Sequence, residues 1–123
     1  MIVNMLNNKP SAVLFDLDGT IADTALDLAA TLNHLLTTSG RNEIHHDRVR
    51  NMVGEGARAL IIKGFEYNNE ELTDQEVEVL HDEYINYYRS HIADKTVLFP
   101  NVFITLETLV RQNIPLAICT NKS

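Results

Sequence analysis

The fold of this chain is decided by the stretch Ala12-Val13-Leu14-Phe15-Asp16-Leu17-Asp18-Gly19-Thr20. Its apolar start predicts a short strand that is covered on both faces, and two carboxylates follow directly where the strand ends. In open α/β sheets, chemically active side chains gather at the carboxyl ends of the strands. Asp16 and Asp18 are therefore predicted to form a site in which one carboxylate attacks an electrophile and the other moves protons. With a divalent cation nearby, the same pair fits phosphoryl transfer.

The Asp-x-Asp-Gly pattern has two other interpretations. One is a simple turn, because Asp-Gly is common in turns and Asp often caps the next helix. The other is a calcium-binding EF-hand loop starting at Asp16, which would need glycine at its sixth position, where this chain has Ile21. The calcium loop is therefore excluded. Because the pattern follows an apolar strand and precedes a capped helix, the catalytic interpretation is favoured over the turn.

Composition narrows the classes of function. The 123 residues are 45% hydrophobic and 22% charged, which is typical of a globular domain. A net charge of -7 argues against nucleic acid or an anionic membrane surface as partner. The single cysteine, Cys119, excludes a disulfide framework and favours a reducing compartment. Residues 1–10 look like a polar leader without a signal-peptide pattern, so a cytoplasmic location is expected.

The middle of the chain, residues 23–92, is predicted to be a block of helices. The first helix begins at Thr24, which with Asp27 resembles a capping box, and ends at Gly40. Further helices are expected over residues 47–53 and 57–65. Thr73 with Glu76 opens the last one, in which Tyr84, Tyr87 and Tyr88 form a stripe more typical of helix core than of a binding surface.

The strand pattern returns after residue 92. A helix follows Asn101, which is a candidate N-cap, and Asn113 fits the left-handed position that ends that helix. Residues 114–119 form a second apolar strand, again followed by small polar groups, Thr120 and Asn121. Residues 1–22 and 93–123 are therefore predicted to form one sheet-based unit, interrupted by the helical block.

The segment Val13 to Thr20, with Asp23 behind it, resembles the first motif of the haloacid dehalogenase (HAD) superfamily, and more closely of its phosphoglycolate phosphatase-like branch. Three further stretches are similar to that branch: Val53-Gly54-Glu55-Gly56-Ala57, Leu98-Phe99-Pro100 and Leu116-Ala117-Ile118-Cys119-Thr120-Asn121-Lys122. The resemblance implies an α/β, Rossmann-like (HAD-like) parallel-sheet core. Residues 1–22 and 93–123 would be the N-terminal part of that core, and residues 23–92 an inserted helical cap.

The resemblance also implies chemical roles. Asp16 would be the nucleophile that forms an aspartyl-phosphate and would also bind Mg²⁺. Asp18 would be the general acid and base, with its backbone carbonyl on the metal. Thr120 and the neighbouring Asn121 would bind the phosphoryl group that is transferred. The implied reaction is Mg²⁺-dependent hydrolysis of a small phosphomonoester, with 2-phosphoglycolate the leading substrate and sugar phosphates or phosphonates as alternatives.

The cap loop is the expected source of substrate selection. Gly54, Glu55 and Gly56 would form the loop that dips towards Asp16, and Arg58 would meet a substrate carboxylate. A plain break between two helices remains the alternative for the glycines, and a solvated helix face the alternative for Arg58. None of the five histidines belongs to a pair with convincing metal-ligand spacing.

The resemblance also implies two motifs beyond the second one: a lysine that balances the charge of the aspartyl-phosphate, and an acidic pair that completes the Mg²⁺ shell. Lys122 is expected to be a surface residue near the site and not that lysine. The chain is thus expected to be truncated after the second motif. The alternative function is a catalytically incomplete fragment that acts, if at all, as a partner-binding module, with homodimerisation through the exposed edge of its sheet.

Overall fold

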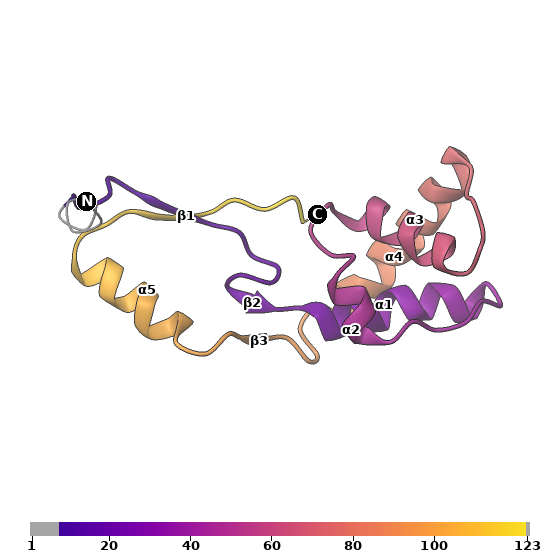
Figure 1. Cartoon of the computed structure of the whole chain (residues 1–123), viewed down its shortest axis with the longest axis horizontal. Helices are drawn as coiled ribbons and strands as arrows, with labels where there is room; N and C mark the ends of the chain where they lie inside the picture. The colour runs from indigo at the N-terminus through magenta and orange to yellow at the C-terminus, as the bar shows by residue number, and fades with distance from the viewer. Residues whose placement is uncertain (1–7, 123) are drawn as a thin grey trace.

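The computed structural model describes residues 8–122, so most of the expected polar leader lies outside the described residues. The described chain runs through β1 (Val13–Phe15), β2 (Ala22–Asp23), α1 (Ala25–Thr38), α2 (His46–Arg50), α3 (Ala57–Tyr67), α4 (Asp74–His91), β3 (Val97–Leu98), α5 (Val102–Arg111) and β4 (Leu116–Ile118). Helices α1 to α4 gather at one end of an elongated molecule, and the strands with α5 occupy the other (Figure 1). None of the helices in the described range is long and apolar enough to cross a membrane.

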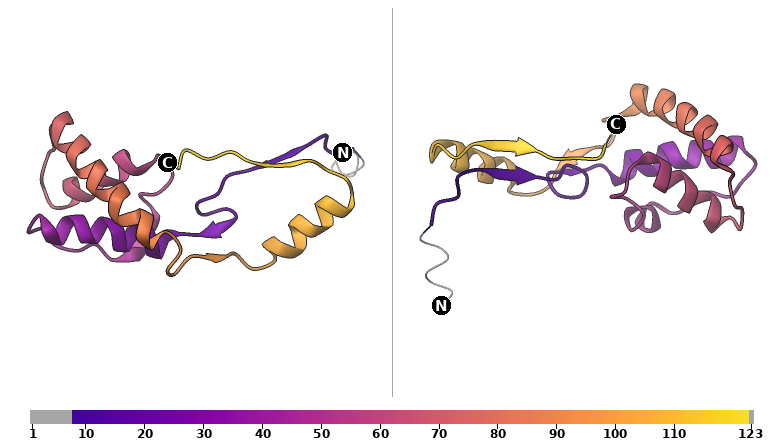
Figure 2. Two further views of the ribbon diagram at one scale, coloured as in Figure 1. Left: turned by 180° about the vertical axis from the view of Figure 1, so that it is seen from behind. Right: turned by 90° about the horizontal axis from the view of Figure 1, so that it is seen from above.

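Strands β1 and β4 form a parallel pair, and they run side by side in both views of Figure 2. Val13 pairs with Leu116 and Phe15 with Ile118. The pairing continues one step further, where the backbone N–H of Cys119 donates to the carbonyl of Phe15 at 2.8 Å. The carboxyl ends of the two predicted strands therefore meet at one edge, as an α/β fold with a parallel sheet requires.

The chain enters and leaves the helical group through the short antiparallel pair β2–β3, in which Asp23 faces Val97. Just beyond it, the buried carboxylate of Asp27 accepts hydrogen bonds from the backbone N–H of Lys95 at 2.9 Å and the hydroxyl of Thr96 at 2.7 Å. The predicted capping box of Thr24 and Asp27 is therefore wrong. Thr24 makes no side-chain cap bond, and its hydroxyl donates to Asp18.

The apolar core lies among helices α1 to α4. Its members are almost completely buried, and all except Ile44 belong to these helices: Leu28, Ala29, Leu32, Leu35, Leu36, Ile44, Val49, Leu60, Ile61, Phe65, Tyr84 and Tyr88. Gly64 of α3 fits directly against Leu32 of α1, where a Cβ atom would come within 2.7 Å of Leu32 Cδ1. The predicted capping box of Thr73 and Glu76 is confirmed at the start of α4. At α4, the local sequence thus predicts both the start of the helix and its buried tyrosines.

Strands β1 and β4 and helix α5 are far less covered. Leu14 is 66% exposed, Phe103 is 68% exposed, and α5 has no buried residue. The expectation that β1 is covered on both faces is thus wrong for this chain, because two strands and one crossover helix cannot enclose a parallel sheet. Homodimerisation through this edge, and the division into core and cap at residues 23 and 92, stay predictions.

Two asparagines shape the ends of α5. Asn101 occupies the predicted N-cap position of α5, but it does so in the left-handed region at φ 66°, and its side chain makes no cap bond. Asn113, at φ 54°, occupies the left-handed position predicted for the end of the helix. Asn tolerates this region because its short polar side chain can bond locally.

Candidate active site

Asp16 and Asp18 lie on the turn that leaves β1. The backbone N–H groups of Gly19 and Ala22 close this turn through bonds to the carbonyls of Ala22 and Leu17, at 2.9 and 3.1 Å. Gly19 has φ +79°, a conformation that glycine adopts without steric cost. The tight turn holds both carboxylates at the carboxyl end of the strand.

The two carboxylates have unlike surroundings. Asp16 is exposed, and its Oδ1 accepts a hydrogen bond from the backbone N–H of Leu17 at 2.8 Å. Within residues 8–122 it forms no ion pair. The Asp18 side chain is only 11% exposed, and its Oδ1 accepts hydrogen bonds from Thr24 Oγ1 at 2.7 Å and Lys122 Nζ at 2.9 Å. One carboxylate is thus open to a reaction partner, while the other is held in place.

Lys122 belongs to this site, which corrects the expectation of a surface residue. Its side chain is 16% exposed, and its ammonium group donates to the hydroxyl of Tyr88 at 2.6 Å as well as to Asp18. Burial alone would lower the pKa of Lys122, but the hydrogen bonds to Tyr88 and Asp18 outweigh burial and raise this pKa. Lys122 therefore remains a cation that joins the end of β4 to helix α4.

The end of β4 also meets the loop at residues 54–56. The amide Nδ2 of Asn121 donates to the carbonyl of Gly54 at 2.6 Å, and a Cβ atom on Gly56 would lie 3.7 Å from the carbonyl oxygen of Asn121. Gly54 and Gly56 have φ of 128° and 91°, which favour glycine. Thr120 is exposed, and its hydroxyl accepts from the backbone N–H of Lys122 at 3.1 Å. The predicted phosphate-binding pair is thus brought beside the predicted cap loop.

Glu55 and Arg58 point to other partners. Glu55 pairs with Lys63 at 3.0 Å, and Arg58 pairs with Glu78 of α4 at 2.7 Å. Both pairs are substantially exposed. Arg58 thus lies on a solvated helix face in an ion pair, and it is absent from the lining of the cavity beside Asp18.

A cavity of about 40 Å³ lies between the end of β4 and the helices. Its polar wall comprises Asp18, Asn121, Lys122, Tyr84 and Tyr88, and its remaining wall comprises Leu28, Val53, Gly54, Gly56, Ala57, Leu60 and Ile85. The Tyr84 hydroxyl is buried and has no hydrogen-bond partner among the described residues. Burial raises the pKa of Tyr84, and the nearby Tyr88 and Asp18 raise it further, so the hydroxyl stays protonated.

The sequence predicts that the tyrosine stripe belongs to the helix core rather than to a binding surface. Tyr84 and Tyr88 are indeed buried, at 2% and 6% exposure, but they also line the cavity beside Asp18. Sequence reasoning therefore missed three groups of the site, Tyr84, Tyr88 and Lys122. One signal was available for Lys122: it follows β4 at the same sheet edge at which Asp18 follows β1.

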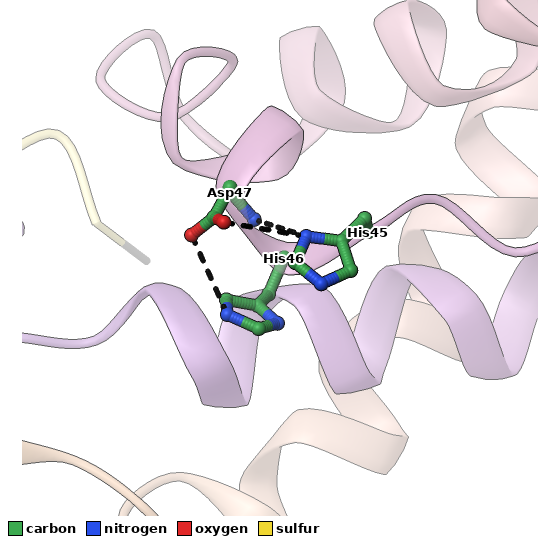
Figure 3. Close-up of side chains that lie close together, drawn as sticks. All are labelled: His45, His46 and Asp47. Atoms are coloured by element: carbon green, nitrogen blue, oxygen red, sulfur yellow. Dashed lines mark hydrogen bonds and ion pairs between the residues drawn. The ribbon is translucent and has the colours of Figure 1, made fainter.

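His45, His46 and Asp47 bring one potential ligand atom each to within 4.8 Å of one another at the start of α2 (Figure 3). The His45 ring nitrogen Nδ1 already accepts from the backbone N–H of Asp47 at 3.3 Å, as the N-cap of this helix. The side chains are 65%, 42% and 73% exposed. Capping and solvation account for this cluster, and it is absent from the cavity lining.

Comparison with known proteins fits this geometry. The family model for haloacid dehalogenase-like hydrolases matches residues 13–123, from the first residue of β1 onward. The chain belongs to this family. It is similar to phosphoglycolate phosphatases from Agrobacterium fabrum, at 36% identity over 110 residues, and Caulobacter vibrioides, at 39% over 112 residues. These matches cover 89% and 91% of this chain and 47% of each relative, so the chain spans about half their length.

Solved structures agree on the fold. A crystal structure of a predicted phosphoglycolate phosphatase from Haemophilus somnus superposes with a TM-score of 0.83 at 31% identity, covering 92% of this chain and 52% of that one. A second structure, from Lactobacillus delbrueckii subsp. bulgaricus, gives a TM-score of 0.86 at 25% identity, covering 94% and 56%. The arrangement of strands and helices is thus that of part of a HAD-like hydrolase, covering about half of each of these two structures.

Proposed function

We propose that this chain carries the nucleophile and the acid–base residue of a phosphatase that hydrolyses a small phosphomonoester through an aspartyl-phosphate. One observation carries the proposal. Asp16, which is exposed, and Asp18, which is fixed by Thr24 and Lys122, both follow β1. They lie beside the end of β4, which is followed by Thr120 and Asn121. A nucleophile needs free access to its electrophile, whereas an acid–base group needs a fixed position.

The proposed reaction has two steps. In the first, an oxygen of Asp16 attacks phosphorus, the bond from phosphorus to the leaving oxygen breaks, and Asp18 gives its proton to that oxygen. In the second, Asp18 takes a proton from water, the water oxygen attacks phosphorus, and the bond to Asp16 breaks, releasing inorganic phosphate. Oδ2 of Asp18 is the oxygen for this proton, since Oδ1 already accepts from Thr24 and Lys122.

The phosphoryl group would be bound by the end of β4. The Thr120 hydroxyl already accepts from the backbone N–H of Lys122, so its own hydrogen is free to donate to a phosphoryl oxygen. The backbone N–H of Asn121 would supply a second donor, while the Asn121 side chain holds the loop at Gly54. Binding at this edge positions the phosphorus atom for Asp16.

The residues present fit Mg²⁺, a hard cation that prefers carboxylate and carbonyl oxygens and keeps several waters. Asp16 has a carboxylate without an ion-pair partner within residues 8–122, and the backbone carbonyl of Asp18 is the second candidate ligand. Mg²⁺ would supply positive charge to the phosphoryl oxygens. Asp16 and the Asp18 carbonyl would hold it, with water molecules at its remaining positions.

The substrate we propose is 2-phosphoglycolate, because the relatives at 36% and 39% identity are named phosphoglycolate phosphatases. Sugar phosphates and phosphonates are the alternatives, since the loop at residues 54–56 and the cavity, rather than the two aspartates, would select the leaving group. The reaction is proposed to take place in the cytoplasm.

The test is release of inorganic phosphate from 2-phosphoglycolate by the purified chain with Mg²⁺, compared with Asp16→Asn. The proposal expects release that depends on Mg²⁺ and disappears in the variant. Release at the same rate in Asp16→Asn would contradict the proposed nucleophile. No release from either protein would favour the alternative, a catalytically incomplete fragment.

A further inference from the structure

We propose that Lys122 and Tyr84 form a recognition site for a carboxylate on the leaving-group side of the substrate. The inference rests on the proposed function, because it takes the leaving oxygen to lie at Asp18. In this proposal, Lys122 and Tyr84 select substrates whose leaving group has a negative charge close to the leaving oxygen. It therefore concerns specificity and not the transfer of the phosphoryl group itself.

Lys122 is placed to contact such a carboxylate. Its ammonium group has three N–H donors, and the structure uses two of them, on Asp18 Oδ1 and on the Tyr88 hydroxyl. A leaving oxygen bonded to Asp18 Oδ2 would lie next to the Lys122 ammonium, since Lys122 Nζ is only 2.9 Å from Oδ1 of the same carboxyl group. In glycolate, the carboxylate is separated from that oxygen by a single carbon atom. It would therefore reach Lys122.

Tyr84 supplies an independent observation. Its hydroxyl is buried without a partner in the described chain, and Tyr84 lines the same cavity as Lys122. A buried hydroxyl without a hydrogen bond destabilises a protein, so such groups are rare without a reason. A ligand oxygen accepting from this hydroxyl would satisfy it. The hydroxyl stays protonated, so it can donate to an anion.

The rest of the cavity favours a small ligand. At about 40 Å³ it admits no more than a few water molecules as it stands, so a ligand would enter by opening the loop at Gly54. Apolar side chains of Leu28, Leu60 and Ile85 form much of its wall. In such surroundings a carboxylate needs a cation and a hydrogen-bond donor beside it, and Lys122 and Tyr84 provide them.

The alternative is that Lys122 only neutralises Asp18 and that Tyr84 is only core. Binding of glycolate, the leaving group without phosphate, distinguishes the recognition site from this alternative. It requires no catalysis, so it does not depend on the phosphatase activity. Isothermal titration of glycolate into the purified chain would compare the wild type with Lys122→Met, Lys122→Arg, Tyr84→Phe and the matched control Lys95→Met. Lys95 is exposed, and its side chain forms no ion pair in residues 8–122.

We expect Lys122→Met to weaken glycolate binding about tenfold to a hundredfold, because it removes one charged hydrogen bond to the ligand. The control Lys95→Met should leave glycolate binding unchanged. Lys122→Arg should retain part of the affinity. Tyr84→Phe should weaken binding several-fold and yet raise the urea midpoint of unfolding, because it removes an unsatisfied hydroxyl. A purely structural role for Tyr84 would not separate affinity from stability in this way.

Glycolate binding that is absent in the wild type, or equal in Lys122→Met and the wild type, would overturn the proposal. A Tyr84→Phe protein that is less stable, or that binds glycolate as well as the wild type does, would remove Tyr84 from the site. Hydrolysis of ethyl phosphate, whose leaving group has no carboxylate, tests the proposed phosphatase separately. Asp16-dependent release from ethyl phosphate without glycolate binding would refute the recognition site and leave the phosphatase standing.

Discussion

Asp27, in the first turn of α1, bonds to Lys95 and Thr96 just before β3, and so connects the two segments that lead into and out of the helical group. Its removal should therefore destabilise the whole chain. Asp27 is 2% exposed, and its carboxylate accepts hydrogen bonds from Lys95 N and Thr96 Oγ1. A hydrogen bond to a charged group contributes about 1.5–3 kcal/mol, so two donors give a gross loss of roughly 3–6 kcal/mol. Two effects reduce this loss in Asp27→Ala: the buried charge disappears, and the exposed Lys95 amide can bond to water. The expected net destabilisation is about 2–4 kcal/mol.

Urea unfolding followed by far-UV circular dichroism measures this loss. Asp27→Asn keeps one acceptor oxygen and should cost about half as much as Asp27→Ala. Thr96→Val removes one donor, and the cycle of Asp27→Ala, Thr96→Val and the double variant should give a coupling of about 1 kcal/mol or more. A free energy of unfolding within about 0.5 kcal/mol of the wild type in Asp27→Ala would refute the reasoning, because that is the range of ordinary surface substitutions.

Two further predictions concern packing and pH. Gly64→Ala adds a Cβ atom that would lie 2.7 Å from Leu32 Cδ1, and Leu32 is fully buried. Overpacking should cost about 1–3 kcal/mol, which exceeds the gain of about 1 kcal/mol in helix propensity, so the urea midpoint of unfolding should fall. In a Leu32→Ala background the midpoint should fall less. A raised midpoint would contradict the predicted clash. The Arg50 guanidinium, by its hydrogen bond, lowers the pKa of Asp23 from 3.8 despite the opposing effect of burial. Such a carboxylate stabilises the folded state above its unfolded pKa and loses this effect as the pH falls through the folded pKa. The difference in midpoint between wild type and Arg50→Gln should therefore be constant from pH 7 to about pH 5 and shrink towards pH 3; a difference that grows on acidification would contradict the assignment.

The sequence predicted those parts of the fold that local patterns specify. The apolar run before Asp16 became β1, and the Thr73–Glu76 capping box opened α4 because both of its partners lie within one helical turn. The same pattern failed at Thr24 and Asp27. There, both side chains bond to residues distant from the helix start. Thr24 bonds to Asp18, and Asp27 bonds to Lys95 and Thr96.

The candidate site was predicted in part for the same reason. Asp16 and Asp18 sit in a local motif, whereas the contact of Lys122 with Asp18 joins residues 104 positions apart and leaves no periodic signal. Arg58 illustrates the converse case. The family resemblance implied that Arg58 would meet a substrate carboxylate, but a glutamate on the next helix, Glu78, pairs with it in the structure. Which charges are free to meet a substrate depends on tertiary pairing, and sequence patterns do not specify it.

The central claim is that Asp16 becomes phosphorylated during turnover. The most direct measurement is to mix the chain with 2-phosphoglycolate and Mg²⁺, quench in acid while the reaction proceeds, and map the peptides by mass spectrometry. The account predicts a peptide containing Asp16 that is heavier by one phosphoryl group, absent from Asp16→Asn and retained when Lys95→Met replaces the wild type. Phosphate release without any phosphorylated Asp16 peptide, or with the phosphoryl group on another residue, would contradict the account.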